Sequence, residues 1–189
     1  MQAQTDLTGK ILIAMPAMSD PRFARSVVLI CEHSDKGAMG LVLNRPLPEI
    51  TFPQLLTQLG IDADGPAPVT VRFGGPVEPA RGFVLHAQPP AAPPHEGRIE
   101  IAPGLALTAT RDILEALARG AGPAPAVLAL GYCGWQGGQL EAEILDNGWL
   151  VGEVSDSLIF GASDGLKWAQ ALHGQGIDPS MLSGAAGRA

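Results

Sequence analysis

Four arginines of the first half of the chain lie beside proline or glycine turns, where they could bind an anion. Arg22, Arg25, Arg45 and Arg81 each precede or follow a predicted strand. Brought together by the fold, their guanidinium groups would form a pocket for a carboxylate or a phosphate. Scattered arginines would instead pair with acidic residues on the surface, which is the simpler expectation. The candidate surface for an anion, another ligand or a partner comprises Arg22, Arg25, Asn44, Arg45, Gly74, Gly75, Arg81, His86, Trp135 and Gln139.

A glycine-rich segment, GYCGWQGG at 131–138, separates a predicted strand at 126–130 from a predicted helix. Turns of this kind bind phosphate when backbone N–H groups converge at a helix start. The segment lacks the lysine and the glycine spacing of known phosphate-binding loops. Glu141 and Glu143, early in the helix, would also repel an anion. We therefore expect the glycines to shape the chain rather than to bind a ligand, and we expect both glutamates on a solvated helix face.

Trp135 and Trp149 flank this helix and could stack on a flat ligand. Only 5% of the residues are aromatic, so the chain needs its large rings for packing. We expect both tryptophans to anchor the core.

No catalytic, metal-binding or cofactor-binding residue is predicted. His33 and His86 each follow an apolar run, but no CxxC, HExxH or HxH spacing accompanies them. Ser163 lies in a GxSxG sequence, GASDG at 161–165, but no recognisable pattern of partner residues accompanies it. Cys31, within an apolar run, is expected to be buried, whereas Cys133 in the glycine-rich turn is expected to be accessible, and the sequence leaves open whether its thiol reacts.

The composition is that of an ordinary globular protein. The chain has 189 residues, 46% of them hydrophobic, and a formal net charge of −7. Nucleic-acid binders usually carry a basic face, and no run of Lys and Arg occurs, so direct DNA or RNA binding is disfavoured. No apolar run approaches the ~20 residues of a membrane helix, and the N-terminus lacks signal-peptide features. We expect a cytoplasmic protein that needs no membrane.

Apolar runs, caps and glycine or proline breaks predict the secondary structure. Helices are expected to begin at Thr51, Thr110, Gln139 and Asp164. Extended segments are predicted at 10–15, 26–31, 38–43, 69–73, 82–86, 98–102, 105–107, 126–130, 149–154 and 157–160. The early hairpins and the lack of a repeated strand–helix unit favour an α+β fold with a mixed, largely antiparallel sheet and three to four helices. We expect one domain over 1–189, with an exposed proline-rich loop at 88–96 and a frayed end at 184–189.

Ten short segments, spread over nearly the whole chain, together form a specific pattern. They are LTGKILIAMP at 7–16, DPRF at 20–23, GAMGLVLNRP at 37–46, GGPV at 74–77, GFVLH at 82–86, GYCGW at 131–135, GQLE at 138–141, WL at 149–150, KW at 167–168 and GRA at 187–189. In this order and at this spacing they resemble the YqgE/AlgH family. The resemblance implies a bacterial protein without an assigned activity, whose family name comes from a proposed regulatory role. It also implies a sheet that bifurcates and wraps into a pseudo-barrel. Cys133 stands where alanine is common, which argues against redox chemistry at this position.

Three hypotheses of function follow. The leading one is a non-enzymatic accessory or regulatory protein that binds a protein or a small anionic metabolite. The second is an enzyme with a polar site at a sheet end, formed by His33, Arg45, His86 and the turn at 131–139. The third is a transcriptional regulator that binds DNA, which the acidic charge disfavours. The sequence leaves the partner, the ligand and the oligomeric state open.

Overall fold

A computed structural model describes residues 5–65, 69–88, 96–161 and 163–182. Most of the predicted loop at 88–96 and all of the predicted frayed end at 184–189 lie outside these ranges. The chain forms two compact units. Unit 1 comprises residues 1–45 and 133–189, and unit 2 comprises residues 46–132. The expectation of a single domain stays a prediction.

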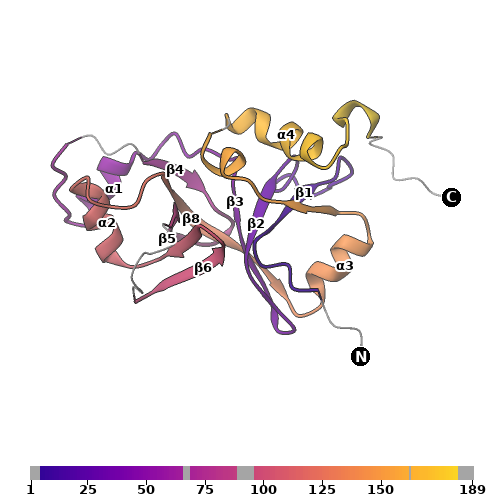
Figure 1. The fold of residues 1–189 in the computed structure, drawn as a ribbon, viewed down its shortest axis with the longest axis horizontal. Coiled ribbons are helices and arrows are strands. Elements are labelled where there is room, and N and C mark those ends of the chain that lie inside the picture. Colours follow the sequence, from indigo (N-terminus) through magenta and orange to yellow (C-terminus); the bar gives the residue numbers. More distant parts are fainter. Residues whose placement is uncertain (1–4, 66–68, 89–95, 162, 183–189) are drawn as a thin grey trace. The chain divides into compact units, whose positions relative to one another are not determined.

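The sheet of unit 1 is antiparallel throughout. Its strands, in spatial order, are the end of β8 (Ala126–Gln136), then β3 (Gly37–Val42), β2 (Val27–Ser34), β1 (Lys10–Ala14) and β9 (Trp149–Glu153) (Figure 1). The apolar runs of β1 and β2 are buried along almost their whole length. That burial is typical of central strands that are covered on both faces.

Two α-helices and three shorter turns of helix complete the described part of unit 1. They are α3 (Gln139–Leu145), a π-helix (Ser157–Gly161), a 3-10 turn (Asp164–Leu166), α4 (Lys167–Gly174) and a second 3-10 turn (Pro179–Met181). Helix α4 contacts β1, β2 and β9, and it buries Trp168, Ala171 and Leu172. The apolar face of α4 thus covers the central strands of unit 1.

Unit 2 combines a mixed sheet with two helices. The spatial order is β6 (Arg98–Ala102), β7 (Leu105–Thr108), β5 (Val77–Ala87), the first part of β8 and β4 (Thr70–Phe73), of which only β4 pairs in parallel. Helix α1 (Phe52–Gln58) begins with a capping box formed by Thr51 and Gln54, as predicted. Helix α2 (Arg111–Ala118) turns Ile113 and Leu117 inward.

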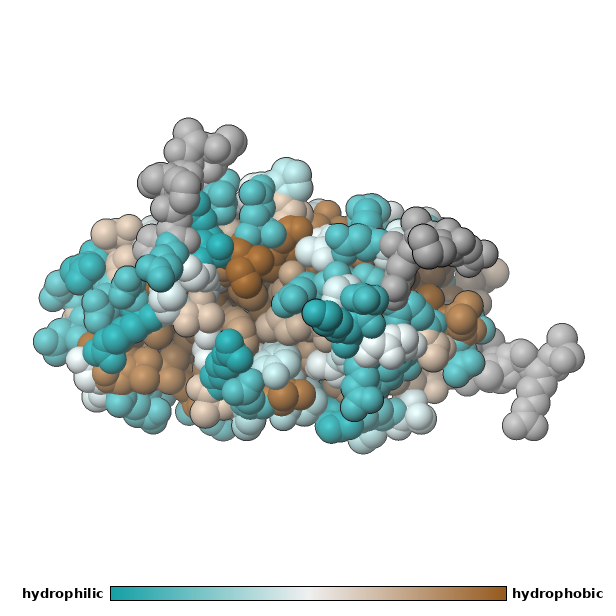
Figure 2. All heavy atoms as spheres, turned by 90° about the horizontal axis from the view of Figure 1, so that it is seen from below, coloured by the Kyte–Doolittle hydropathy of each residue, from teal (hydrophilic) through white to brown (hydrophobic). Residues whose placement is uncertain are grey.

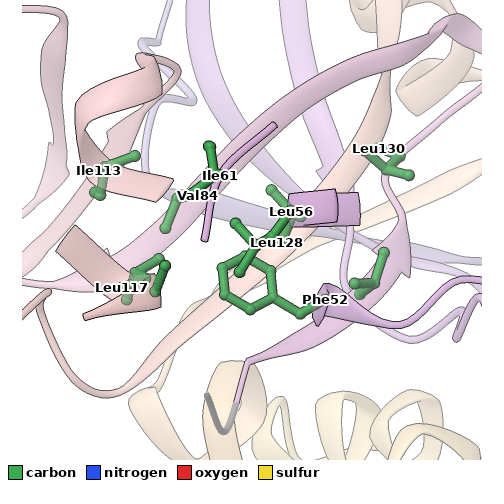
Figure 3. Close-up of a cluster of buried hydrophobic side chains, with 10 residues drawn as sticks. Phe52, Leu56, Ile61, Val84, Ile113, Leu117, Leu128 and Leu130 are labelled. Carbon is green, nitrogen blue, oxygen red and sulfur yellow. The ribbon is translucent and has the colours of Figure 1, made fainter. Parts of the chain in front are cut away.

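Ten buried apolar side chains form the core of unit 2 (Figure 3). They are Phe52, Leu56, Ile61, Val71, Val84, Ile113, Leu117, Ala118, Leu128 and Leu130. Helices α1 and α2 supply half of these residues and the strands most of the others. The core therefore forms between the two helices and the sheet.

The expected α+β class is confirmed, with a mixed, largely antiparallel sheet and four α-helices among the described residues. The expected branching is seen at β8, which pairs with β5, with β4 and, through its last residues, with β3. None of the described helices is long and apolar enough to cross a membrane.

Two local predictions are wrong. The chain does not turn at Gly131: β8 runs on to Gln136, because residues 132–136 pair with β5 and β3, and only Gly137 and Gly138 turn. Residues 157–160 are not extended. They lie in the π-helix, where the Ile159 carbonyl accepts a hydrogen bond from the buried Lys167 ammonium.

Candidate functional site

A short loop of unit 1, residues 20–26, carries two of the predicted arginines, and we call it the arginine loop. Asp20 organises its first half, because the Asp20 carboxylate accepts the backbone N–H of Arg22 and the Asp20 carbonyl accepts those of Phe23 and Ala24. The loop closes at Ser26, whose N–H donates to the Phe23 carbonyl. These local bonds, between residues two to four positions apart, define the shape of the loop.

Asn44 and Arg45, which follow β3, fasten the arginine loop from the other side. The Asn44 side chain accepts the Val27 N–H at 2.9 Å and donates to the Arg25 carbonyl at 2.8 Å. Arg45 Nη2 donates to the carbonyls of Pro21 and Ala24, both at 3.2 Å. Four of the predicted site residues therefore meet around this loop, through backbone bonds that no sequence pattern reveals.

Arg25 borders an open pocket of about 510 Å³. Its guanidinium lies over the Trp168 ring, 5.1 Å from the ring centroid, and its backbone adopts a φ of +54°. Trp168 is fixed in turn, since its indole N–H donates to the Ala14 carbonyl at 2.8 Å. The pocket is lined by Met15, Pro16, Ala24, Arg25, Trp168, Pro179, Ser180 and Leu182. Among these described residues Arg25 is the one charged side chain, so the pocket combines an apolar wall with a cation.

Arg22 is exposed, with 61% of its side chain accessible. It forms a two-pronged pair with Asp20, and the shortest N–O distance is 2.7 Å. The charged hydrogen bonds from Arg22 lower the pKa of the Asp20 carboxyl. Exposed ion pairs contribute little stability, so Arg22 can exchange Asp20 for an external carboxylate or phosphate at small cost.

Cys133 is buried, and the expectation that it is accessible is therefore wrong. Burial raises the pKa of its thiol to about 12, while the charges of Arg22 and Arg45 act in the opposite direction without prevailing. The strand geometry of β8, which replaces the predicted turn, places this side chain in the interior. At neutral pH the thiol stays protonated and shielded.

Trp135 and Trp149 share one acceptor, the carboxylate of Glu143 in α3. Their indole nitrogens lie 2.9 Å and 2.8 Å from Glu143 Oε2, and the two rings meet edge to face at 6.2 Å. Gln139 donates to the other carboxylate oxygen at 2.9 Å. Both tryptophans are buried, as expected. The expectation that Glu143 lies on a solvated face is wrong, because its carboxylate links α3 to β8 and β9 through the two indole N–H groups. Trp135 and Gln139, which both donate to this carboxylate, therefore have structural roles.

The predicted site residues of unit 2 are distributed over three places. Gly74 donates its N–H to the Leu130 carbonyl at 2.8 Å, and the Gly75 carbonyl lies 2.3 Å from where a Cβ on Gly131 would stand. These glycines therefore permit a close approach of two backbones. Arg81 lies over the Phe83 ring.

His86 is buried in β5, and its Nε2 lies 3.0 Å from the Thr108 hydroxyl oxygen. It borders a mostly apolar cavity of about 190 Å³ beside α2, to which Thr108 and Ile113 also contribute. His86 is the second-last residue of β5 and pairs with Ala126, the first residue of β8, so it lies near the end of the strand as expected, and its side chain bonds across to the neighbouring strand β7.

The enzyme hypothesis requires His33 and Arg45 to converge, and within unit 1 they do not. Asn44, next to Arg45, bonds Val27 at the start of β2, whereas His33 pairs with Ala38 at the far end of that strand. Six residues of extended chain separate the two ends by about 20 Å. His33 is engaged elsewhere: its Nδ1 accepts the Leu7 N–H, so Nε2 carries the proton and donates to Glu141 at 2.8 Å.

Across the part of the chain that the structure describes, no group of three His, Cys, Asp or Glu side chains is placed to hold a metal ion. The described residues form a hydrogen-bonded, cationic loop beside an apolar pocket in unit 1, a further pocket of about 610 Å³ in unit 1 between residues 153–161 and 170–175, and two small pockets in unit 2. Such an arrangement suits recognition of a ligand or a partner.

The fold and these sites define a small α+β protein with a branched sheet, and comparison with known proteins gives its family. Residues 11–180 match the AlgH-like family. The chain is 60% identical to a UPF0301 protein of Paracoccus denitrificans, with full coverage of both chains, and 52% identical to one of Jannaschia sp. over 97% of this chain and 96% of the relative. The chain belongs to the AlgH-like family.

Two solved structures share the fold. The AlgH protein from Pseudomonas aeruginosa, solved in solution, is 39% identical with a TM-score of 0.78, covering 100% of this chain and 99% of that one. A Corynebacterium diphtheriae protein, DIP2367, has a TM-score of 0.71 at 21% identity over 92% and 89% of the two chains, which shows the fold alone. The predicted family is confirmed.

Proposed function

We propose that the protein is a non-enzymatic accessory protein that binds an acidic segment of a partner protein at the arginine loop. The observation that supports this most is the gathering of Arg22, Arg25, Asn44 and Arg45 around residues 20–26. Because hydrogen bonds hold the main chain of the loop, its backbone needs little ordering when a partner binds, which lowers the entropic cost of association.

The adjoining pocket specifies the kind of segment. Its wall is formed by Met15, Pro16, Trp168 and Leu182, and Arg25 stands at its edge. An apolar side chain fits this wall while a neighbouring carboxylate meets Arg25. Aromatic and arginine side chains of this kind often dominate the affinity of protein interfaces. The partner segment therefore carries an acidic residue next to an apolar one.

The surface of the protein is compatible with recognition by charge. On the face drawn in Figure 2, hydrophobic residues form separate areas that hydrophilic residues border.

The test uses affinity capture from a bacterial lysate with three immobilised proteins: the wild type, the double variant R22S/R25S, and R119S. Arg119, the C-cap residue of α2, is exposed and lies outside the arginine loop, so its substitution changes charge without changing the loop. A partner retained by the wild type and R119S but lost by R22S/R25S is the expected result. Its purified form should bind more weakly as salt rises, because exposed charges are screened.

A partner that all three proteins retain equally, or the absence of any partner, would contradict the proposal. The binding of promoter DNA is tested separately. A salt-sensitive shift of promoter DNA that R22S/R25S abolishes would assign the loop to nucleic acid instead.

A further inference from the structure

A second pocket, which lies wholly in unit 2, opens onto the hydrophobic core between α1 and α2. Its volume is about 250 Å³. Both helices and strands β5 and β8 contribute apolar side chains to its wall, namely Leu55, Leu59, Val84, Leu114, Leu128 and Leu130. Val84, Leu128 and Leu130 belong to the core cluster (Figure 3). The pocket thus extends the core toward solvent.

The charged groups of this pocket are all cationic among the described residues that line it. They are Arg81 from β5 and Arg111 from α2. Each forms an exposed ion pair with a glutamate outside the pocket, Arg81 with Glu78 at 3.2 Å and Arg111 with Glu115 at 2.9 Å. Exposed pairs contribute little stability, so a ligand anion can compete for both guanidinium groups. To meet the ligand, the Arg81 guanidinium also leaves the Phe83 ring, over which it lies.

Arg111 is held at the pocket by the backbone of α1. Its Nη1 donates to the carbonyl of Leu59, the C-cap residue of α1, at 2.9 Å, and its Nη2 lies 3.5 Å from the Gly60 carbonyl. The guanidinium is therefore positioned before a ligand arrives, which favours binding of an anion in one place.

Thr110 adds an unused polar group. It lines the pocket as the N-cap residue of α2, yet its side chain does not cap the helix, and its buried hydroxyl has no hydrogen-bond partner in the described part of the chain. Buried polar groups normally have partners, so this hydroxyl calls for an explanation. The positive end of the α2 dipole lies at the same place and favours negative charge there.

We propose that this pocket binds a small amphipathic anion, with a carboxylate or phosphate head at Arg81 and Arg111 and an apolar tail against the leucines. The volume of about 250 Å³ corresponds to roughly eight groups of the size of a water molecule, each of about 30 Å³. A straight chain of about eight carbon atoms matches that space. This inference does not depend on the arginine loop, because all residues that line the pocket belong to unit 2 and the arginine loop belongs to unit 1.

The direct test is isothermal titration calorimetry of the full chain with octanoate and with octyl phosphate. 1-Octanol serves as the uncharged probe, and acetate and inorganic phosphate serve as heads without a tail. We expect both amphipathic anions to bind at least about tenfold more tightly than either octanol or the isolated heads, which corresponds to about 1.4 kcal/mol. The tighter of the two identifies a carboxylate or a phosphate as the preferred head.

Matched variants locate the binding. Leu59 lines the pocket and is 40% exposed, so L59E places a carboxylate at the mouth of the pocket and should abolish binding of octanoate. L59Q has nearly the same shape without the charge and should still bind octanoate. R81S should weaken binding at least about fivefold through loss of a charge-assisted hydrogen bond, whereas R119S should not. Circular dichroism confirms that each variant is folded. Octanol binding as tightly as octanoate, or octanoate binding that survives both L59E and R81S, would overturn the proposal.

Discussion

The ammonium nitrogen of Lys167 lies 3.1 Å from Asp164 Oδ1, and the lysine side chain is completely buried. The same nitrogen donates to the carbonyls of Leu43 at 3.0 Å and Ile159 at 3.1 Å. One cation thus joins the end of β3, the π-helix and the start of α4. A buried charge is tolerated only when it is paired and hydrogen-bonded, and these bonds meet that requirement.

Replacing Lys167 by Met should lower the free energy of unfolding by about 3–5 kcal/mol, because the substitution leaves Asp164 without its buried counter-charge. Urea denaturation followed by circular dichroism measures the loss. K36M is the matched control, since Lys36 is exposed and its substitution should change stability by less than about 0.5 kcal/mol. Equal stability of K167M and K36M would show that the buried ammonium contributes nothing.

Replacing Glu143 by Ala should cost about 2–4 kcal/mol, because two buried indole N–H groups lose their acceptor. The near-ultraviolet circular dichroism of the tryptophans should change in the native state, since Trp135 and Trp149 are no longer held edge to face. E153A removes an exposed carboxylate that pairs with Lys10 and should cost only about 0–1 kcal/mol. An E143A protein as stable as E153A would contradict the structural role of Glu143.

The pKa of Cys133, which burial raises from 9.0 to about 12, makes stability fall at alkaline pH. The native thiol holds its proton more tightly than the unfolded thiol, so the stabilisation is complete below about pH 9 and is lost as the pH rises toward 12. The slope that this group contributes is at most about 1.4 kcal/mol per pH unit. Urea titrations at several pH values should show a smaller slope for C133A than for the wild type.

The thiols should also be inert in the native protein. Cys31 and Cys133 are both buried, and burial raises the pKa of each. Ellman's reagent at pH 8 should therefore react with neither until the chain is unfolded in urea. Rapid modification of one thiol per native chain that is lost in C133A would refute the burial of Cys133.

Gly131 should tolerate alanine far less well than Gly120 does. Both residues have a positive φ, +76° and +69°, so an alanine in either position carries about 1–2 kcal/mol of backbone strain. A Cβ at Gly131 would stand 2.3 Å from the Gly75 carbonyl oxygen, whereas at Gly120 nothing lies within 4 Å. The difference between the melting temperatures of G131A and G120A isolates the clash, and equal values would show that the backbones can separate.

The starts and ends of helices could be predicted from the sequence where a single local interaction determines them. Thr51 and Gln54 mark the start of α1 because the capping box uses residues three positions apart, and glycines mark most helix ends. The strand through Gly131 and Gly134 was missed, since glycine is a poor strand former and the pairing with β3 and β5 overrides that preference.

The candidate site was predictable only in part. Arg22 and Arg25 are neighbours in sequence, but their connection to Asn44 and Arg45 depends on how β2 and β3 pair. Arg111 was missed as a ligand-binding candidate, although its place in the first turn of a predicted helix was visible. What makes Arg111 relevant is the approach of α1, which is a tertiary contact that no spacing encodes.

The division of the chain has a consequence for synthesis on the ribosome. Unit 2 is one continuous segment that is complete at Tyr132, whereas unit 1 needs residues 133–189. Strands β1 to β3 leave the ribosome first, yet β1 acquires its neighbour β9 only from the last quarter of the chain. Unit 2 can therefore fold before β9 and α4, which cover β1 and β2, have been synthesised. During that interval these two apolar strands are the segments most in need of protection by a chaperone.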